Sequence, residues 1–307
     1  MREPVMVPEA EFRSYYGKPV INEPVWQSPD IPGYLYLGGL AGASSALGLG
    51  AQLTGRPGLA RPAKAAAAAA AGLSLAALVH DLGRPGRFYN MLRVFKPTSP
   101  MSVGSWLLAG YVPLAFVSAG TAVTGLMPAV GTAASAGAAL LGPAVASYTA
   151  VLISDTAVPA WHEGHRHMPY LFVSSAASAA GGFGLLAAPR RQNGPARRLG
   201  MAGAAGELLL ANAMEKQMGM AGRAYKEGRA HRWMRASEAL TVAGLLGAGA
   251  GARRSRLAAV VSGAALLAGS AFTRWGVFEA GLQSARDPAH TVIPQRERLR
   301  RRPAPGG

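Results

Sequence analysis

A window of 58 residues, from Pro97 to Ser154, contains no charged side chain. About 20 mostly apolar residues in a helix can cross the hydrocarbon core of a bilayer, which is about 30 Å thick. The window is therefore long enough for two spans, with a break near Met127–Gly131. A soluble helical bundle would need a charged face on each helix, and this window offers none. The window predicts an integral membrane protein.

The composition agrees with this prediction. Only 15% of the residues are charged, against about 25% in an average soluble domain. Two further windows, Ile31–Gly55 and His167–Pro189, contain no Asp, Glu, Lys or Arg. The chain has no cysteine, which excludes disulfides, c-type haem attachment and cysteine-ligated iron–sulfur clusters in this chain.

We expect an all-α integral membrane protein built as a bundle of eight transmembrane helices. The predicted spans are Pro32–Leu53, Ala63–His80, Val103–Met127, Thr132–Asp155, Met168–Ala188, Leu199–Gln217, Met234–Ala252 and Leu257–Gly281. The last two are the weakest, because Arg and Glu residues interrupt them. The chain then divides into an N-terminal extramembrane tail (1–31), a transmembrane domain (32–281) and a basic C-terminal tail (282–307). Small residues that recur three or four positions apart predict close helix packing.

Eight spans place both termini on one side of the membrane. That side carries 20 Lys and Arg residues and the opposite side carries 10, which favours cytoplasmic termini. The opposite loops are shorter and have the higher charge density, which favours the reverse orientation. The net charge of +16 is explained by this membrane bias. No basic helix with interleaved aromatic residues suggests nucleic-acid binding.

The segment HDLGRPGRFYNMLRVFKPTSPMSVGSW, from His80 to Trp106, is polar and Pro-rich, and it separates two apolar stretches. It lies on the side that bears the termini, together with the other long connections. Long loops beside a bilayer commonly form a docking surface or cover a site. We expect one of these roles for this segment.

Glu207 is an ionisable residue near the middle of the predicted sixth span. Such a group costs about 2.5–3.5 kcal/mol on insertion scales and suggests function by default. It could relay protons or contact a ligand, together with Glu215 one or two turns further on. A protonated carboxyl group that is hydrogen-bonded to a neighbouring helix is an equally good interpretation.

Tyr148 and Asp155 are seven residues apart and share one helix face. A phenol and a carboxylate near a span end could bind a quinone carbonyl and accept its proton. The alternative is an interfacial Tyr and a helix-end Asp. His80 and Asp81 end the second span in the same way.

The stretch Trp161–His167 contains three histidines spaced H-x-x-H-x-H. This spacing lacks the helical i, i+4 pair of H-E-x-x-H zinc sites, so we predict no metal site here. No pair of histidines lies within the predicted spans, so we also predict no haem.

Four segments carry a family resemblance: SYYGKPVINEPVW, IPGYLYLGGLAGASS, the His80–Trp106 segment, and SYTAVLISDTAVPAWHEGHRHMPYLFVSSAASAAGG. The chain resembles the NrfD/PsrC family, the membrane subunits of polysulfide-reductase-like complexes. The resemblance implies an eight-helix subunit of the bacterial cytoplasmic membrane that is not catalytic toward the terminal substrate. It would exchange electrons between menaquinone or ubiquinone and a ferredoxin-like iron–sulfur subunit, which contacts a molybdopterin catalytic subunit.

The resemblance also implies roles for single residues. Tyr148 resembles a tyrosine of the quinone pocket, and Glu207 resembles an acidic residue of the sixth span. The family often has a His at the start of its first span, but here Asp30, Tyr34 and Tyr36 occupy that stretch.

The hypothesis assigns three roles to residues of this chain. The residues expected to bind quinone are Tyr148, Asp155, His80, Asp81, Tyr34 and Tyr36. Those expected to transfer protons are Asp81, Glu207 and Glu215, and those expected to dock a partner are Arg84, Arg87, Arg93, Lys96, Trp161 and His162. The alternative is a structural anchor or a proton-conducting subunit without its own quinone site. In that case Glu207, Glu215, Glu238 and Glu279 would matter more than Tyr148.

Overall fold

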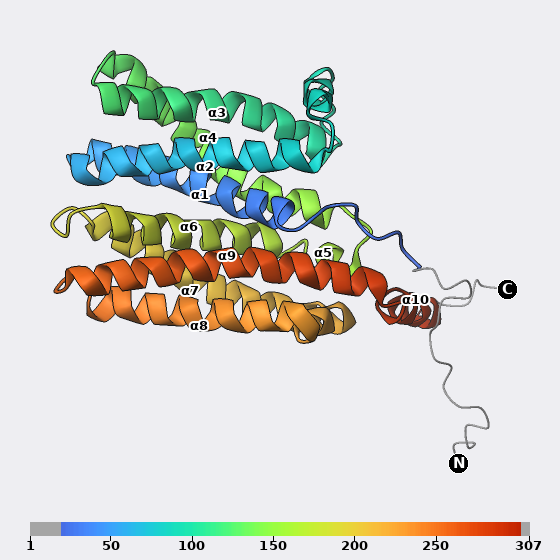
Figure 1. The fold of residues 1–307 in the computed structure, drawn as a ribbon. Coiled ribbons are helices and arrows are strands. Elements are labelled where there is room, and N and C mark those ends of the chain that lie inside the picture. Colours follow the sequence, from blue (N-terminus) through green and yellow to red (C-terminus); the bar gives the residue numbers. More distant parts are fainter. Residues whose placement is uncertain (1–19, 302–307) are drawn as a thin grey trace, which may run out of the picture.

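The computed structural model describes residues 20–301, with side chains as far as residue 297, and these residues form an all-helical bundle. The long helices are α1 (Asp30–Leu53), α2 (Pro57–Asp81), α3 (Pro100–Thr124), α4 (Pro128–Ser154), α6 (Met168–Ala187), α7 (Gly194–Gln217), α8 (Gly228–Ala250) and α9 (Arg256–Arg286). The short helices are η1 (Pro85–Leu92), α5 (Pro159–His162), η2 (Gly219–Tyr225) and α10 (Ala289–Arg301). The long helices lie side by side and roughly antiparallel (Figure 1).

The eight long helices follow the eight predicted spans with ends that differ by at most six residues, as at the starts of α2 and α8. Within the described part of the chain, five of them are long and apolar enough to cross a membrane: α2, α3, α4, α6 and α9. The last predicted span, expected to be weak, is therefore among these five. Its helix α9 continues past the predicted domain end to Arg286, and α10 lies within the predicted C-terminal tail.

Local chemistry explains where several helices begin and end. Proline occupies the first turn of α2, α3 and α4, where its missing N–H has no partner to lose. Helix α3 ends at Thr124 and is followed by Gly125, whose φ of 74° is a left-handed conformation that glycine adopts without a steric penalty. Ser255 caps α9 by accepting a hydrogen bond from the backbone N–H of Ala258 at 3.3 Å.

The bundle consists of two groups of four helices, the first half (α1–α4) and the second half (α6–α9). In one group α1 packs on α2 and α4, and α3 packs on α2 and α4; in the other, α6 packs on α7 and α9, and α8 packs on α7 and α9. Helix α6 joins the groups by packing against α1 and α4 (Figure 1).

Glycines allow the closest helix contacts. A Cβ atom on Gly42 of α1 would lie 2.2 Å from the carbonyl oxygen of Gly142 on α4, and one on Gly142 would lie 2.3 Å from that of Gly42. Gly182 of α6 and Gly263 of α9 form a similar contact. Within lipid, helices associate through such backbone contacts because no hydrophobic effect drives them together.

The bundle has two unlike ends. The short-connection end carries the turns α1–α2, α3–α4, α6–α7 and α8–α9, and the terminus end carries η1, α5, η2 and α10 (Figure 1). Side chains brace the short-connection end: Arg256 donates to the carbonyl oxygens of Leu185 (2.9 Å) and Ala188 (2.8 Å) at the end of α6. These bonds satisfy carbonyl groups that a helix C-terminus leaves without partners.

Candidate functional site

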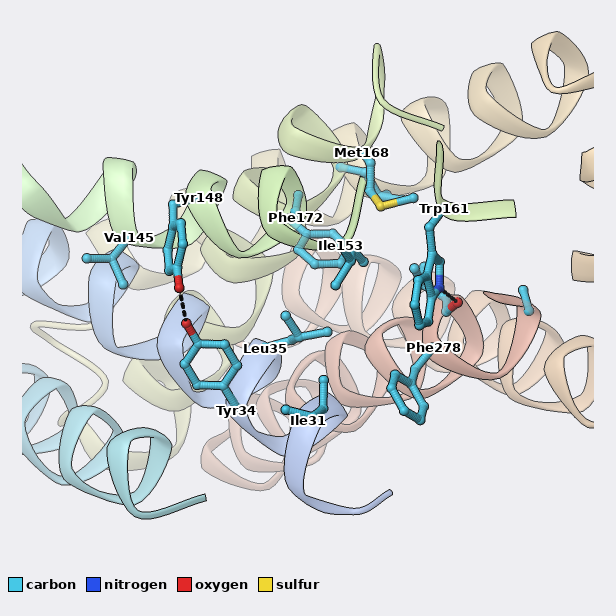
Figure 2. Packing of buried hydrophobic residues seen from close by; sticks show 14 of the residues in the cluster. Ile31, Tyr34, Leu35, Val145, Tyr148, Ile153, Trp161, Met168, Phe172 and Phe278 are labelled. Carbon is cyan, nitrogen blue, oxygen red and sulfur yellow. Dashed lines mark hydrogen bonds between the residues drawn. The ribbon is translucent and has the colours of Figure 1, made fainter. Parts of the chain in front are cut away.

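A pair of buried tyrosines joins α1 to α4 near the terminus end. The Tyr34 hydroxyl donates to the Tyr148 hydroxyl at 2.8 Å, and the two residues are 0% and 9% exposed (Figure 2). Because Tyr34 is the donor in this bond, the proton of the Tyr148 hydroxyl remains available to another acceptor. The Tyr148 hydroxyl can therefore donate a hydrogen bond to a carbonyl group.

Helices α2 and α3 complete the surroundings of this pair. Ser74 of α2 donates to the backbone carbonyl of Tyr34 at 3.1 Å. A Cβ atom on Gly104 of α3 would lie 1.9 Å from the Tyr148 ring, so the ring can take its place only beside a glycine. All four helices of the first half thus position the two hydroxyl groups.

Acidic and imidazole groups lie at the end of the same helices. Asp30, one turn before Tyr34, contacts His80 at 2.7 Å between Oδ2 and Nδ1. The Oδ1 atom of Asp81 accepts from the backbone N–H of Gln27 at 3.1 Å. The predicted residues Tyr34, Tyr148, His80 and Asp81 are thus brought to one end of one half of the bundle.

Two other predicted quinone ligands do not join this group. Asp155 follows the last residue of α4 and is exposed. Tyr36 is half-buried and lies within electrostatic range of Arg274 on α9, a helix of the other half. Helical periodicity placed Tyr148 and Asp155 on one face, but α4 ends at Ser154, so only Tyr148 lies within the helix and in the core.

The predicted docking residues divide into exposed and buried members. The side chains of Arg84, Arg87, Arg93 and Lys96 are all exposed on the connection around η1. Ser102 holds this connection against the start of α3: its hydroxyl donates to the Val94 carbonyl at 3.0 Å and accepts from the Lys96 N–H at 2.9 Å. The exposed His162 lies on α5, with its Nδ1 atom 3.2 Å from the Ser154 carbonyl oxygen.

Trp161 differs from its prediction. Its side chain is 0% exposed, its Nε1–H donates to the Val277 carbonyl at 2.8 Å, and its ring lies 5.8 Å from that of Phe278 (Figure 2). A partner cannot reach this ring, so the assignment of Trp161 to a docking surface is corrected. Helix α5 turns the apolar Trp161 ring toward the core, and it leaves the polar side chains of His162 and Glu163 exposed.

Glu207 of α7 is buried between three helices of the second half. Its Oε1 atom accepts from the Ser175 hydroxyl of α6 at 2.7 Å and from the Thr273 hydroxyl of α9 at 2.5 Å. Its Oε2 atom has no hydrogen-bond partner among the described residues. Both interpretations of Glu207 thus keep a physical basis: one oxygen is hydrogen-bonded to neighbouring helices, and the other is free to bind a proton.

A cavity of about 580 Å³ adjoins Glu207 between α7, α8, α9 and η2. Glu215, Lys226, His231, Arg235 and Glu238 also line it. The Lys226 Nζ atom lies 3.8 Å from Glu215 Oε2, and an Arg235–Glu238 pair is formed at 2.9 Å. Ionisable groups thus line a continuous space from the buried carboxyl group toward η2 at the terminus end.

Sequence reasoning missed the surroundings of Glu207. Arg274 is fully buried, with its guanidinium 3.8 Å from the centre of the Phe172 ring and an Nη2 bond of 2.8 Å to the Phe172 carbonyl. The sequence did contain a signal for Arg274, which is a charged residue inside the predicted span Leu257–Gly281. Ser175 and Thr273 carried no signal, because hydroxyl residues are frequent in this chain.

Among curated proteins, no sequence matches the chain. A family model described as "Polysulphide reductase, NrfD" matches residues 19–284, a range that includes α1 to α8 and almost all of α9. Because this match spans both halves of the helical bundle and most of the chain, the protein belongs to the NrfD family, whose members are membrane subunits of redox complexes.

Proposed function

We propose that this protein is the quinone-reactive membrane subunit of a multi-subunit oxidoreductase. NrfD subunits associate with iron–sulfur and molybdopterin subunits of redox complexes. This chain has no cysteine for a cluster of its own, so its electrons would pass to or from a ferredoxin-like partner. The observation that carries the proposal is the buried Tyr34–Tyr148 pair, which leaves one hydroxyl proton free for a carbonyl acceptor.

Each group at the terminus end has a task in this proposal. A bound quinone supplies two-electron, two-proton chemistry, and the protein supplies position and protons. Tyr148 donates to a quinone carbonyl, and Tyr34 holds the Tyr148 ring in place. The Asp30–His80 pair and Asp81 hold protons at the membrane edge, within one or two helical turns of the tyrosines. The exposed cations around η1 contact the partner.

Tyr148→Phe is the direct test of this proposal. It removes the free donor, and we expect quinone-coupled turnover of the intact complex to fall about tenfold, which corresponds to one hydrogen bond of about 1.4 kcal/mol. Turnover is measured in membranes with a quinol analogue and an artificial electron acceptor. Unchanged turnover would remove Tyr148 from the quinone site.

Matched variants separate chemistry from stability. Tyr148→Phe leaves the buried Tyr34 hydroxyl without its acceptor, at a cost of about 1–3 kcal/mol. The double variant Tyr34→Phe/Tyr148→Phe removes both hydroxyls, so it should be folded and should show the same loss of turnover, about tenfold. Tyr111→Phe removes another buried hydroxyl, which bonds Ser45 at 2.9 Å, and should leave turnover intact. Equal losses in the Tyr111 and Tyr148 variants would mean that both act through the fold.

A second function, proton conduction, is favoured by the cavity beside Glu207. A free carboxylate oxygen on a space lined by Glu215, His231 and Glu238 meets the needs of a proton relay. This role can accompany quinone chemistry or replace it. The variants of Glu207 in the Discussion distinguish these cases.

We also propose that all eight long helices cross the bacterial cytoplasmic membrane and that both termini are cytoplasmic, as the larger number of Lys and Arg residues at that end favours. A fluorescent reporter on the C-terminus should then fold and fluoresce, and a periplasmic phosphatase reporter at the same place should be inactive. The same pair of reporters in the α1–α2 turn should give the opposite result. A reversed pattern would place the exposed η1 connection, and with it the docking surface, outside the cytoplasm.

A further inference from the structure

A second cavity, of about 280 Å³, opens at the short-connection end of the first half, between the α1–α2 and α3–α4 turns. Three basic residues line it: Arg56, Arg61 and Lys64. The other polar side chains of the lining are neutral: Gln52, Thr121 and Thr132. No carboxylate is among the lining residues, so the protein supplies three positive charges to this space and no counter-charge.

Lys64 is the buried member of this cluster, with 6% of its surface exposed. Its Nζ atom donates to the side-chain oxygen of Gln52, and the Gln52 Nε2 atom donates to the Thr132 hydroxyl at 2.9 Å. Within the described part of the chain Lys64 forms no salt bridge. A buried ammonium group is costly unless a charge of opposite sign pairs with it, so this position favours an anion from outside the chain.

The whole short-connection end has the same imbalance. Ten basic residues lie on or beside its turns: Arg56, Arg61, Lys64, Arg190, Arg191, Arg197, Arg198, Arg253, Arg254 and Arg256. The connections of this end, and the helix turns next to them, contain no Asp or Glu. The cavity of the α1–α4 half combines this charge with a space of about 280 Å³.

Large apolar side chains are exposed at positions adjacent in sequence to the lining of this cavity. Leu53 is 71% exposed, Val123 is 74% exposed, and Met127 is 71% exposed. They lie next to lining residues, at the ends of α1 and α3 and the start of α4. A free anion in water gains nothing from these surfaces, whereas acyl chains attached to the anion would cover them.

We propose that this cavity, defined by Arg56, Arg61, Lys64, Thr121 and Thr132, binds the phosphate headgroup of an anionic phospholipid. Arginine suits a phosphate because its planar guanidinium group can donate two parallel hydrogen bonds. Lys64 supplies a fixed charge behind them, and the two threonine hydroxyls can bond a glycerol headgroup. Basic pockets between transmembrane helices bind acidic lipid headgroups by the same physics.

The test is native mass spectrometry of the delipidated full-length protein in detergent, titrated with phosphatidylglycerol or phosphatidylcholine. We expect one phosphatidylglycerol to bind at least tenfold more tightly than phosphatidylcholine. Arg56→Gln/Arg61→Gln should reduce this affinity by about tenfold or more. Both side chains are partly or fully exposed, so the fold does not depend on them.

Arg190→Gln/Arg191→Gln is the matched control, because it removes two charges from the same end of the bundle but outside the cavity. This control should bind phosphatidylglycerol as tightly as the unchanged protein. Equal losses in the two double variants would mean attraction by net charge alone and would overturn the site. Inorganic phosphate that displaces the lipid at equal concentration would overturn the lipid assignment and leave a site for free phosphate.

Discussion

Replacing Gly42 with alanine is expected to push α1 away from α4 and to reduce both stability and quinone-coupled turnover. The new Cβ atom would lie 2.2 Å from the carbonyl oxygen and 2.9 Å from the carbonyl carbon of Gly142. Both are backbone atoms of a long helix, so no side chain can turn aside to make room. Overpacking of this kind costs about 1–3 kcal/mol and sometimes more.

The effect on function follows from the place of this contact. Gly42 and Gly142 set the distance between the helices that carry Tyr34 and Tyr148, which are joined by a single 2.8 Å hydrogen bond. A shift of about 1 Å is enough to break such a bond. The measurements are the thermal midpoint in detergent and quinone-coupled turnover of the complex.

Gly50→Ala is the matched control within the same helix. Nothing lies within 4 Å of a Cβ atom at Gly50, and Gly→Ala inside a helix stabilises by about 0.5–1 kcal/mol. We expect the Gly50 variant to be at least as stable as the unchanged protein. If Gly42→Ala were equally stable, the close approach of α1 to α4 would be wrong.

Replacing Glu207 with glutamine is expected to stop proton transfer through the second half of the bundle while the fold persists. Glutamine keeps an oxygen that can accept from Ser175 and Thr273, but it cannot take up and release a proton. Loss of a proton-transfer group commonly costs about 100-fold in rate. Proton flux is measured with a pH-sensitive dye in liposomes that contain the whole complex, alongside quinol oxidation.

Two further variants are controls for the Glu207→Gln result. Glu227→Gln changes an exposed carboxylate outside the cavity and should leave the proton flux unchanged. Glu207→Leu leaves the buried Ser175 and Thr273 hydroxyls without their carboxylate acceptor, so it should lower the thermal midpoint as well. Lost flux with quinol oxidation retained supports proton conduction. Parallel loss of both activities would place Glu207 at the quinone site, and unchanged flux would end the relay hypothesis.

Much of the fold could be predicted because helix formation in lipid is a local property. A chain in the hydrocarbon core must satisfy its own backbone hydrogen bonds, so an uncharged window such as Pro97–Ser154 directly predicts helices. The eight predicted ranges accordingly agree with the eight long helices of the described chain. The connection that follows His80 was predicted to form a docking surface or to cover a site; it contains η1, and a hydrogen bond from Ser102 to the Val94 carbonyl fixes it to the start of α3.

Sequence patterns pointed to single side chains of the candidate site but not to their surroundings. Tyr34, Tyr148 and Glu207 were all named from the sequence, but their partners come from other helices. Tyr34 and Tyr148 are 114 residues apart in the chain. Trp161 shows the limit most clearly, because it was named among the docking residues and the fold buries its ring.

The sequence by itself determined that this is a helical membrane protein of the NrfD family, because span length, glycine spacing and family motifs are written along the chain. Only the tertiary structure decided that Tyr34 meets Tyr148, that Glu207 adjoins a polar cavity, and that Arg56, Arg61 and Lys64 face Thr121 and Thr132 across a basic one. The physical reason is that these contacts depend on which helix faces meet and how closely. Backbone contacts such as Gly42–Gly142 set both, and they join residues that no local pattern connects.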